Sequence, residues 1–170
     1  VNNIPALTAM MADIGLPVIN NYVLKAQDEA NELLRELHLP LMVRALHPNQ
    51  TNTRQIVERL DDFEDAINLA KTQSVTQEVI ISRAINGLKE VSIEILRDVR
   101  GNKMQIGASE DMDPIGIHTA DSLSVSPILT IQDQLIGRMR DYAFRIADML
   151  QLKGVMHVQF AVDDDTHTIY

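Results

Sequence analysis

The first half of the chain alternates short apolar runs with segments of helical period. Residues 17–19, Pro-Val-Ile, form an apolar run that predicts a strand. Apolar residues then recur at helical spacing between residues 26 and 37, which predicts a helix. The run 40–44 is short and begins with proline, which favours a buried strand over a helix. Residues 46–53 have no period and contain a proline, so we expect an irregular loop there.

A second helix is predicted to end near Thr72. Its apolar face is formed by Phe63, Ala66, Ile67 and Ala70. Acidic residues precede and begin this pattern, where the positive end of a helix dipole favours negative charge. The run 78–81 then returns to strand.

The second half of the chain is richer in strands. Val91, Ile93 and Ile95 alternate with more polar neighbours, as in a strand with one buried face. Residues 98–102 have the composition of a turn, so we expect a hairpin with a strand at 104–108.

The longest helix is predicted at residues 131–151, with Thr130 as its N-cap. We expect it to pack on the sheet that contains a strand at 155–162. A turn at 163–165 and a final strand at 166–170 complete the pattern. The three consecutive aspartates of that turn lack the spaced ligands and glycine of a calcium loop, so a solvated turn is favoured over a metal site.

Interleaved strands and helices followed by a strand-rich half predict the α+β class. We expect a helical lead-in at 1–15, a small lobe at 16–85 and a larger lobe at 86–170. The chain begins with valine and ends within a strand pattern, so we expect it to be truncated at the C-terminus.

Composition narrows the classes of function. The chain has 170 residues, 45% of them hydrophobic and 23% charged, which is typical of a globular protein with a core. A formal net charge of -9 argues against a nucleic-acid partner, because phosphate binding requires lysine and arginine. With no cysteine, disulfides and thiolate chemistry are excluded. The sequence shows no signal peptide and no apolar run of membrane-spanning length, so we expect a cytoplasmic protein with no membrane partner.

One motif is specific enough to indicate a family. The run Gly116–Pro127 reads Gly-Ile-His-Thr-Ala-Asp-Ser-Leu-Ser-Val-Ser-Pro. It resembles the G-I-H-T-G-D-S-hydrophobic-T-V-A-P signature of the first ATP-grasp half of the carbamoyl phosphate synthetase large subunit. Further similarities lie at matching distances, at residues 14–17, 43–44, 89–90 and 158–162.

The resemblance implies an ATP-grasp fold in which two lobes clamp ATP in a cleft. In that family the module phosphorylates bicarbonate on the way to carbamoyl phosphate. ATP and magnesium are therefore the expected cofactors, and bicarbonate is a candidate ligand. Further synthetase domains and a glutaminase subunit are candidate partners.

The resemblance also assigns site residues, none of them as a catalytic group. Arg44 would approach the phosphates, where its planar fork of donors suits phosphate oxygens. Glu90 would accept hydrogen bonds from the ribose, and Gln159 would give magnesium an oxygen ligand. The remaining nucleotide-binding residues are Ile85, through its backbone beside adenine, and Gly116, Ile117 and His118.

The loop after the second strand departs from the family pattern. The family has glycines there, whose backbone N–H groups approach the phosphates, whereas residues 46–54 contain none. Gln50 and Thr51 stand where the paired glycines are expected, and Pro48 has no N–H to donate. This departure predicts weak ATP binding.

Three more departures bear on activity. Ile4 stands near a family arginine, Arg83 stands at an acidic position, and the family's magnesium-bridging Glu and Asn would follow Tyr170. Two readings therefore remain open: an ATP-dependent ligase module that is inactive as this fragment, and a non-catalytic structural or interaction module with the same fold. From the residues alone, Arg44 and Glu90 also fit an exposed strand end and a surface ion pair.

Overall fold

The computed structural model describes residues 4–24, 37–49, 54–117 and 121–170. The chain divides into two compact units. The first comprises Val1–Ala12 and Val18–Ala84, and the second comprises Asp13–Pro17 and Ile85–Tyr170. Each unit has its own sheet and its own apolar core.

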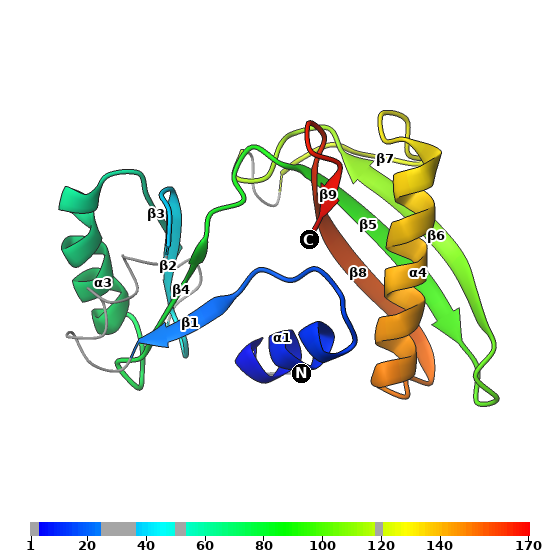
Figure 1. Ribbon diagram of the computed structural model, residues 1–170, viewed down its shortest axis with the longest axis horizontal. Helices are drawn as coiled ribbons and strands as arrows, with labels where there is room; N and C mark the ends of the chain where they lie inside the picture. The colour runs from blue at the N-terminus through cyan, green and yellow to red at the C-terminus, as the bar shows by residue number, and fades with distance from the viewer. Residues whose placement is uncertain (1–3, 25–36, 50–53, 118–120) are drawn as a thin grey trace. The chain divides into compact units, whose positions relative to one another are not determined.

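The first unit is built on a four-stranded antiparallel sheet in the order β1-β4-β2-β3. These strands are β1 (Asn21–Leu24), β4 (Val79–Arg83), β2 (Leu41–Ala45) and β3 (Gln55–Val57). The unit also contains α1 (Ile4–Asp13) as far as Ala12, the 3₁₀ turn η1 (Leu60–Asp62) and α3 (Phe63–Thr72). α3 lies beside this sheet (Figure 1). Its buried residues, which include Phe63 and Ile67, pack on Leu41, Val43 and Val57 of the sheet.

Several local predictions for this unit are confirmed, and two are wrong. The strands expected at 40–44 and 78–81 correspond to β2 and β4, and the second helix ends at Thr72. The strand expected at 17–19 instead begins at Asn21, whose amide donates to Thr8 Oγ1 and to the Ile19 carbonyl. β3 was not expected, because its three residues are too few to show a period. The helix expected at 26–37 falls mainly on residues 25–36, outside the described residues.

The second unit contains a five-stranded antiparallel sheet in the order β7-β6-β5-β8-β9. The strands are β5 (Lys89–Arg97), β6 (Lys103–Asp111), β7 (Ser124–Val125), β8 (Gly154–Asp163) and β9 (Thr168–Ile169). The single long helix α4 (Asp133–Met149) lies across one face of this sheet (Figure 1). Leu135, Met139 and Ala143 of α4 pack there against Val91, Ile93 and Ile95 of β5.

The hairpin, the long helix and its packing on the sheet are confirmed, and with them the α+β class. The predicted N-cap is wrong, because Gln132 and not Thr130 precedes the helix. Thr130 instead donates through both its backbone N–H and its hydroxyl to the buried Glu110 carboxylate. No helix within the described ranges is long and apolar enough to cross a membrane.

Asp148 near the end of α4 joins the helix to the β5–β6 hairpin. It accepts hydrogen bonds from Lys103 and, at 3.0 Å, from Arg97 Nε. Arg97 also donates to the Leu152 carbonyl at 2.8 Å. The hydrogen bond from Lys103, followed by that from Arg97, lowers the pKa of Asp148 below its usual value.

We expect Met139→Ala to lower the free energy of unfolding by about 2–5 kcal/mol, because it leaves a cavity in a fully buried site. Met104→Ala is the matched control, since that side chain is 56% exposed and its loss should cost under about 0.5 kcal/mol. Urea unfolding of both variants measures the difference. Equal losses would show that the α4–sheet core is not packed as described.

We expect Asp148→Asn to lower the free energy of unfolding at pH 7 by about 0.2–1 kcal/mol, the range for a partly exposed ion pair. Because the folded pKa is lowered, this stabilisation is present above the unfolded value of about 3.9 and disappears as the pH falls through the folded pKa. Urea unfolding at several pH values should therefore show wild type and variant converging in acid. A difference that persists unchanged at low pH would contradict the assignment.

Candidate functional site

Two segments of the second unit that are far apart in sequence lie side by side next to the start of β5. The Gly87 N–H donates to the Ile115 carbonyl at 2.9 Å, and the Ile115 N–H donates to the Leu88 carbonyl at 2.9 Å. The structure thereby brings the segment after Ile85 next to the segment containing Gly116 and Ile117. Three of the predicted nucleotide-binding positions therefore gather within one unit.

Gly116 is required by the local geometry of this pairing. Its φ of +95° lies in the region that favours glycine. A Cβ built at this position would lie 2.3 Å from Nδ2 of Asn86. A side chain at residue 116 would therefore have to displace Asn86, a residue that no local sequence pattern indicates.

Glu90 and Gln159 meet on the face of the sheet opposite to α4. Val91 points into the α4 core, so strand alternation places Glu90 on the other face. Glu90 pairs with Ala161 of β8, and Gln159 is two residues away on the same face. Gln159 Nε2 donates to Glu90 Oε1 at 2.6 Å. This bond orients the amide so that its oxygen points away from the carboxylate contact.

The same face continues along β5 and β8 as a polar row. His157 Nδ1 lies 3.6 Å from Glu94 Oε1, and Ser92 Oγ lies 3.5 Å from His157 Nε2. Both members of the His157–Glu94 pair are about half exposed. Beside the Glu90–Gln159 pair, this face of the sheet is therefore polar and hydrogen-bonding.

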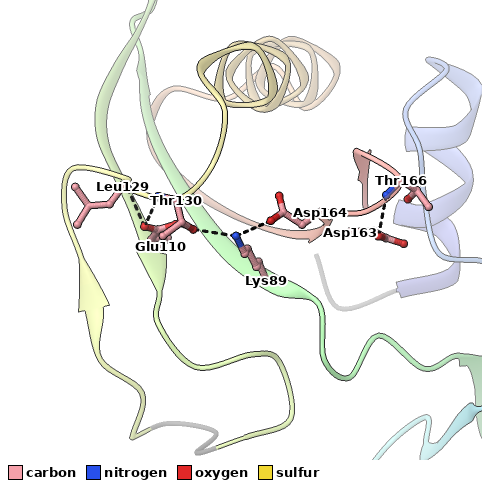
Figure 2. Close-up of polar contacts among 7 residues, drawn as sticks. All are labelled: Lys89, Glu110, Leu129, Thr130, Asp163, Asp164 and Thr166. Atoms are coloured by element: carbon pink, nitrogen blue, oxygen red, sulfur yellow. Dashed lines mark hydrogen bonds and ion pairs between the residues drawn. The ribbon is translucent and has the colours of Figure 1, made fainter.

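A buried carboxylate holds the start of β5 in place (Figure 2). Glu110, which is 2% exposed, accepts the backbone N–H groups of Leu129 and Thr130 and the Thr130 hydroxyl, at 2.8–2.9 Å. Lys89 donates to the same hydroxyl at 3.0 Å and to Asp164 at 2.8 Å. Glu90, next to Lys89 in sequence, is thus tied to the segment before α4 and to the β8–β9 turn.

Sequence reasoning missed Glu110, although a signal was present. An acidic residue at the end of an apolar, alternating strand is either exposed or held by several donors. The Ser-Pro-Ile-Leu-Thr segment that follows offers such donors, but only the fold brings it within reach of residue 110.

Arg44 lies in the first unit, near the end of β2. Its Nε atom is buried and has no hydrogen-bond partner among the described residues. Burial, followed by repulsion from Arg54, lowers the pKa of Arg44 from its ordinary value. The guanidinium remains charged at neutral pH and has donors available for an anion.

The remaining predicted positions are not tested by the structure. His118 lies outside the described residues, as do Gln50 and Thr51 of the glycine-free loop. Within the described ranges no group of three or more His, Asp or Glu side chains could hold a metal ion. Gln159 with Glu90 could therefore supply only part of a magnesium site, and the remaining ligands would have to come from bound phosphates or water.

The chain is similar to known proteins in sequence and in fold. A family model described as carbamoyl-phosphate synthase L chain, ATP binding domain, matches residues 5–170. The carbamoyl phosphate synthase large chain of Pyrococcus furiosus is 32% identical over 160 residues, which cover 94% of this chain and 15% of that protein. The chain therefore spans about a seventh of the length of that curated relative.

Solved structures show the same fold. A biotin carboxylase from Campylobacter jejuni, in complex with βγ-ATP, matches with a TM-score of 0.85 and 20% identity over 99% of this chain and 39% of that one. The biotin carboxylase domain of Hydrogenobacter thermophilus 2-oxoglutarate carboxylase, in complex with MgADP, ADP and bicarbonate, matches with a TM-score of 0.77 and 17% identity over 96% and 37%. These likenesses confirm the ATP-grasp fold expected from the motif. Because the family model matches residues 5–170, nearly the whole chain, the chain belongs to the family of carbamoyl-phosphate synthase L-chain ATP-binding domains.

Proposed function

We propose that this chain is a nucleotide-binding module that binds ATP together with magnesium. The observation that carries the proposal is the gathering of Ile85, Gly116, Ile117 and the Glu90–Gln159 pair at one end of the larger sheet. Backbone groups and apolar atoms of the 85–88 and 114–117 segments suit a planar base, and Glu90 suits ribose hydroxyls. Family membership and the nucleotide complexes of similar structures support the same ligand.

Magnesium would be held by the Gln159 amide oxygen and by the nucleotide phosphates. The donor set fits, because magnesium favours oxygen ligands and shares them with bound phosphates. Because Gln159 Nε2 donates to Glu90, the amide oxygen is the atom of Gln159 that remains for a cation. Arg44 of the first unit and His118 of the signature motif are proposed as further nucleotide contacts.

In a longer protein, this module would phosphorylate bicarbonate toward carbamoyl phosphate, in the cytoplasm and alongside further synthetase domains and a glutaminase subunit. The large-chain relative and the bicarbonate in a similar structure support this wider role. A structural or interaction module with little ATP turnover is the second candidate. The absence of glycine from residues 46–54 favours it.

Calorimetric titration with MgATP tests the nucleotide site. We expect Glu90→Ala to weaken binding by about 10–100-fold, since each hydrogen bond to a charged group contributes about 1.5–3 kcal/mol and 1.4 kcal/mol is a factor of ten. Glu94→Ala is the control, because Glu94 lies on the same face of β5, four pairs along the ladder from the Glu90–Ala161 pair. It should change affinity less than about twofold.

Two outcomes of that titration would count against the proposal. Failure of the wild-type chain to bind MgATP at millimolar concentration would favour the non-nucleotide module. Equal effects of the two substitutions would remove Glu90 from the site while leaving nucleotide binding intact.

Gly116→Ala should both weaken MgATP binding and lower the free energy of unfolding by about 1–3 kcal/mol, because φ is +95° and the new Cβ meets Asn86. Gly137→Ala is the matched control. Its Cβ would meet nothing within 4 Å, and in the middle of α4 it should stabilise by about 0.5–1 kcal/mol. Thermal unfolding and calorimetry measure both effects. A Gly116→Ala protein with wild-type stability and affinity would contradict the close approach of the two segments.

A further inference from the structure

The register of the smaller sheet places two arginines opposite each other. β2 and β3 pair antiparallel with Leu41 opposite Val57, Met42 opposite Ile56 and Val43 opposite Gln55. Continued by one residue, this ladder would put Arg44 opposite Arg54, which immediately precedes β3, and the two guanidiniums are close enough to repel each other. Residues directly opposite each other on antiparallel strands have Cβ atoms about 4.5–5.5 Å apart.

Both arginines belong to the face that α3 does not cover. Leu41, Val43 and Val57 are buried against α3, so alternation directs Met42 and Arg44 to the other face. Arg44 is half-buried and Arg54 is exposed. A ligand can therefore reach the exposed guanidinium of Arg54, while the half-buried guanidinium of Arg44 is held by its surroundings.

This pair of positive charges is not neutralised within the described residues. Like charges directly opposite each other destabilise a sheet. Neither guanidinium forms an ion pair with a carboxylate in the part of the chain that the structure describes. Arg44 Nε is buried without a hydrogen-bond partner there, and repulsion from Arg54 contributes to the lowered pKa of Arg44. An anion with several oxygens would relieve both defects.

A phosphate chain suits the pair better than a single carboxylate does. Each guanidinium can donate two parallel hydrogen bonds to oxygens on one phosphorus, so two neighbouring guanidiniums match two successive phosphates. Nucleic acid presents phosphates as well, but a net charge of -9 opposes association with a polyanion of that length. The chemistry that remains is a short polyphosphate.

We propose that Arg54 binds the polyphosphate of a nucleotide together with Arg44. The Arg54 side chain would then replace part of the phosphate contact that backbone N–H groups make in a glycine-rich loop, because residues 46–54 contain no glycine. The inference rests on the proposed function and adds to it a phosphate-binding residue. Arg54 is the last residue of the glycine-free segment 46–54. This segment would therefore still donate hydrogen bonds to phosphate, through a side chain.

Calorimetry with MgATP and with inorganic tripolyphosphate tests this pair on the whole chain. We expect Arg54→Gln to weaken both ligands by about 10–100-fold, the loss of one bidentate charged contact. It should also make affinity less dependent on salt, because one cation no longer meets the anion. Arg54→Lys should recover part of the affinity, since it keeps the charge without the fork.

Arg59→Gln is the matched control. Arg59 belongs to the same unit, is 74% exposed and pairs with Asp61 at 3.1 Å, so its loss should leave both affinities within about twofold. The thermal midpoint of Arg54→Gln should equal or exceed that of the wild type, because one of two repelling charges is gone. That result separates lost binding from lost folding.

The outcomes distinguish this inference from the proposed function. Wild-type binding of MgATP that Arg54→Gln leaves unchanged would overturn the role of Arg54 and leave the nucleotide site standing. Binding of tripolyphosphate but not MgATP, lost in Arg54→Gln, would support the arginine pair and overturn ATP as the ligand. Failure of the wild type to bind either ligand would overturn both. A lowered thermal midpoint together with lost binding would also overturn the phosphate-binding role of Arg54, because the arginine would then be structural.

Discussion

The alternation of side chains along β5 is the constraint on which the larger unit depends. β5 is hydrogen-bonded on both sides, to β6 and to β8, and its register with β8 is unbroken from Lys89 to Arg97. A period of two then sends Val91, Ile93 and Ile95 into the core with α4 and leaves Glu90 on the opposite face. The same interaction that builds the core therefore positions the site, and a shift of one residue would destroy both.

Burial of Glu110 extends that rigidity to the end of the sheet. A buried carboxylate is costly unless donors surround it, and here two backbone N–H groups and a hydroxyl do so. Its three donors come from the segment before α4, so Glu110 anchors the chain just ahead of the helix. Lys89 joins this arrangement through Thr130 and Asp164 (Figure 2). The neighbouring Glu90 consequently projects from a strand whose end has little freedom to move.

Local patterns predicted the elements that are long and periodic. The apolar face of α4 and the alternation at residues 91–95 both follow from burial on one side, which a sequence displays directly. The short strands β3 and β7 contain too few residues to show a period, and the Thr130 cap failed because a distant carboxylate competes for the same groups. The motif at residues 116–127 indicated the family, yet the need for glycine at 116 became evident only from the approach of Asn86.

The position of Arg54 across from Arg44 also could not be predicted from a local pattern, because it depends on the β2–β3 register. This position also bears on whether residues 46–54 can bind phosphate without glycine. Backbone N–H groups in a glycine-rich loop bind phosphate without a cost in side-chain order, whereas an arginine loses up to about 2 kcal/mol of rotamer freedom when it is immobilised. Two arginines that already repel each other recover part of this cost when an anion removes the repulsion. Because salt screens charged side chains, a phosphate site made of arginines loses affinity at high salt, but it does not require glycine.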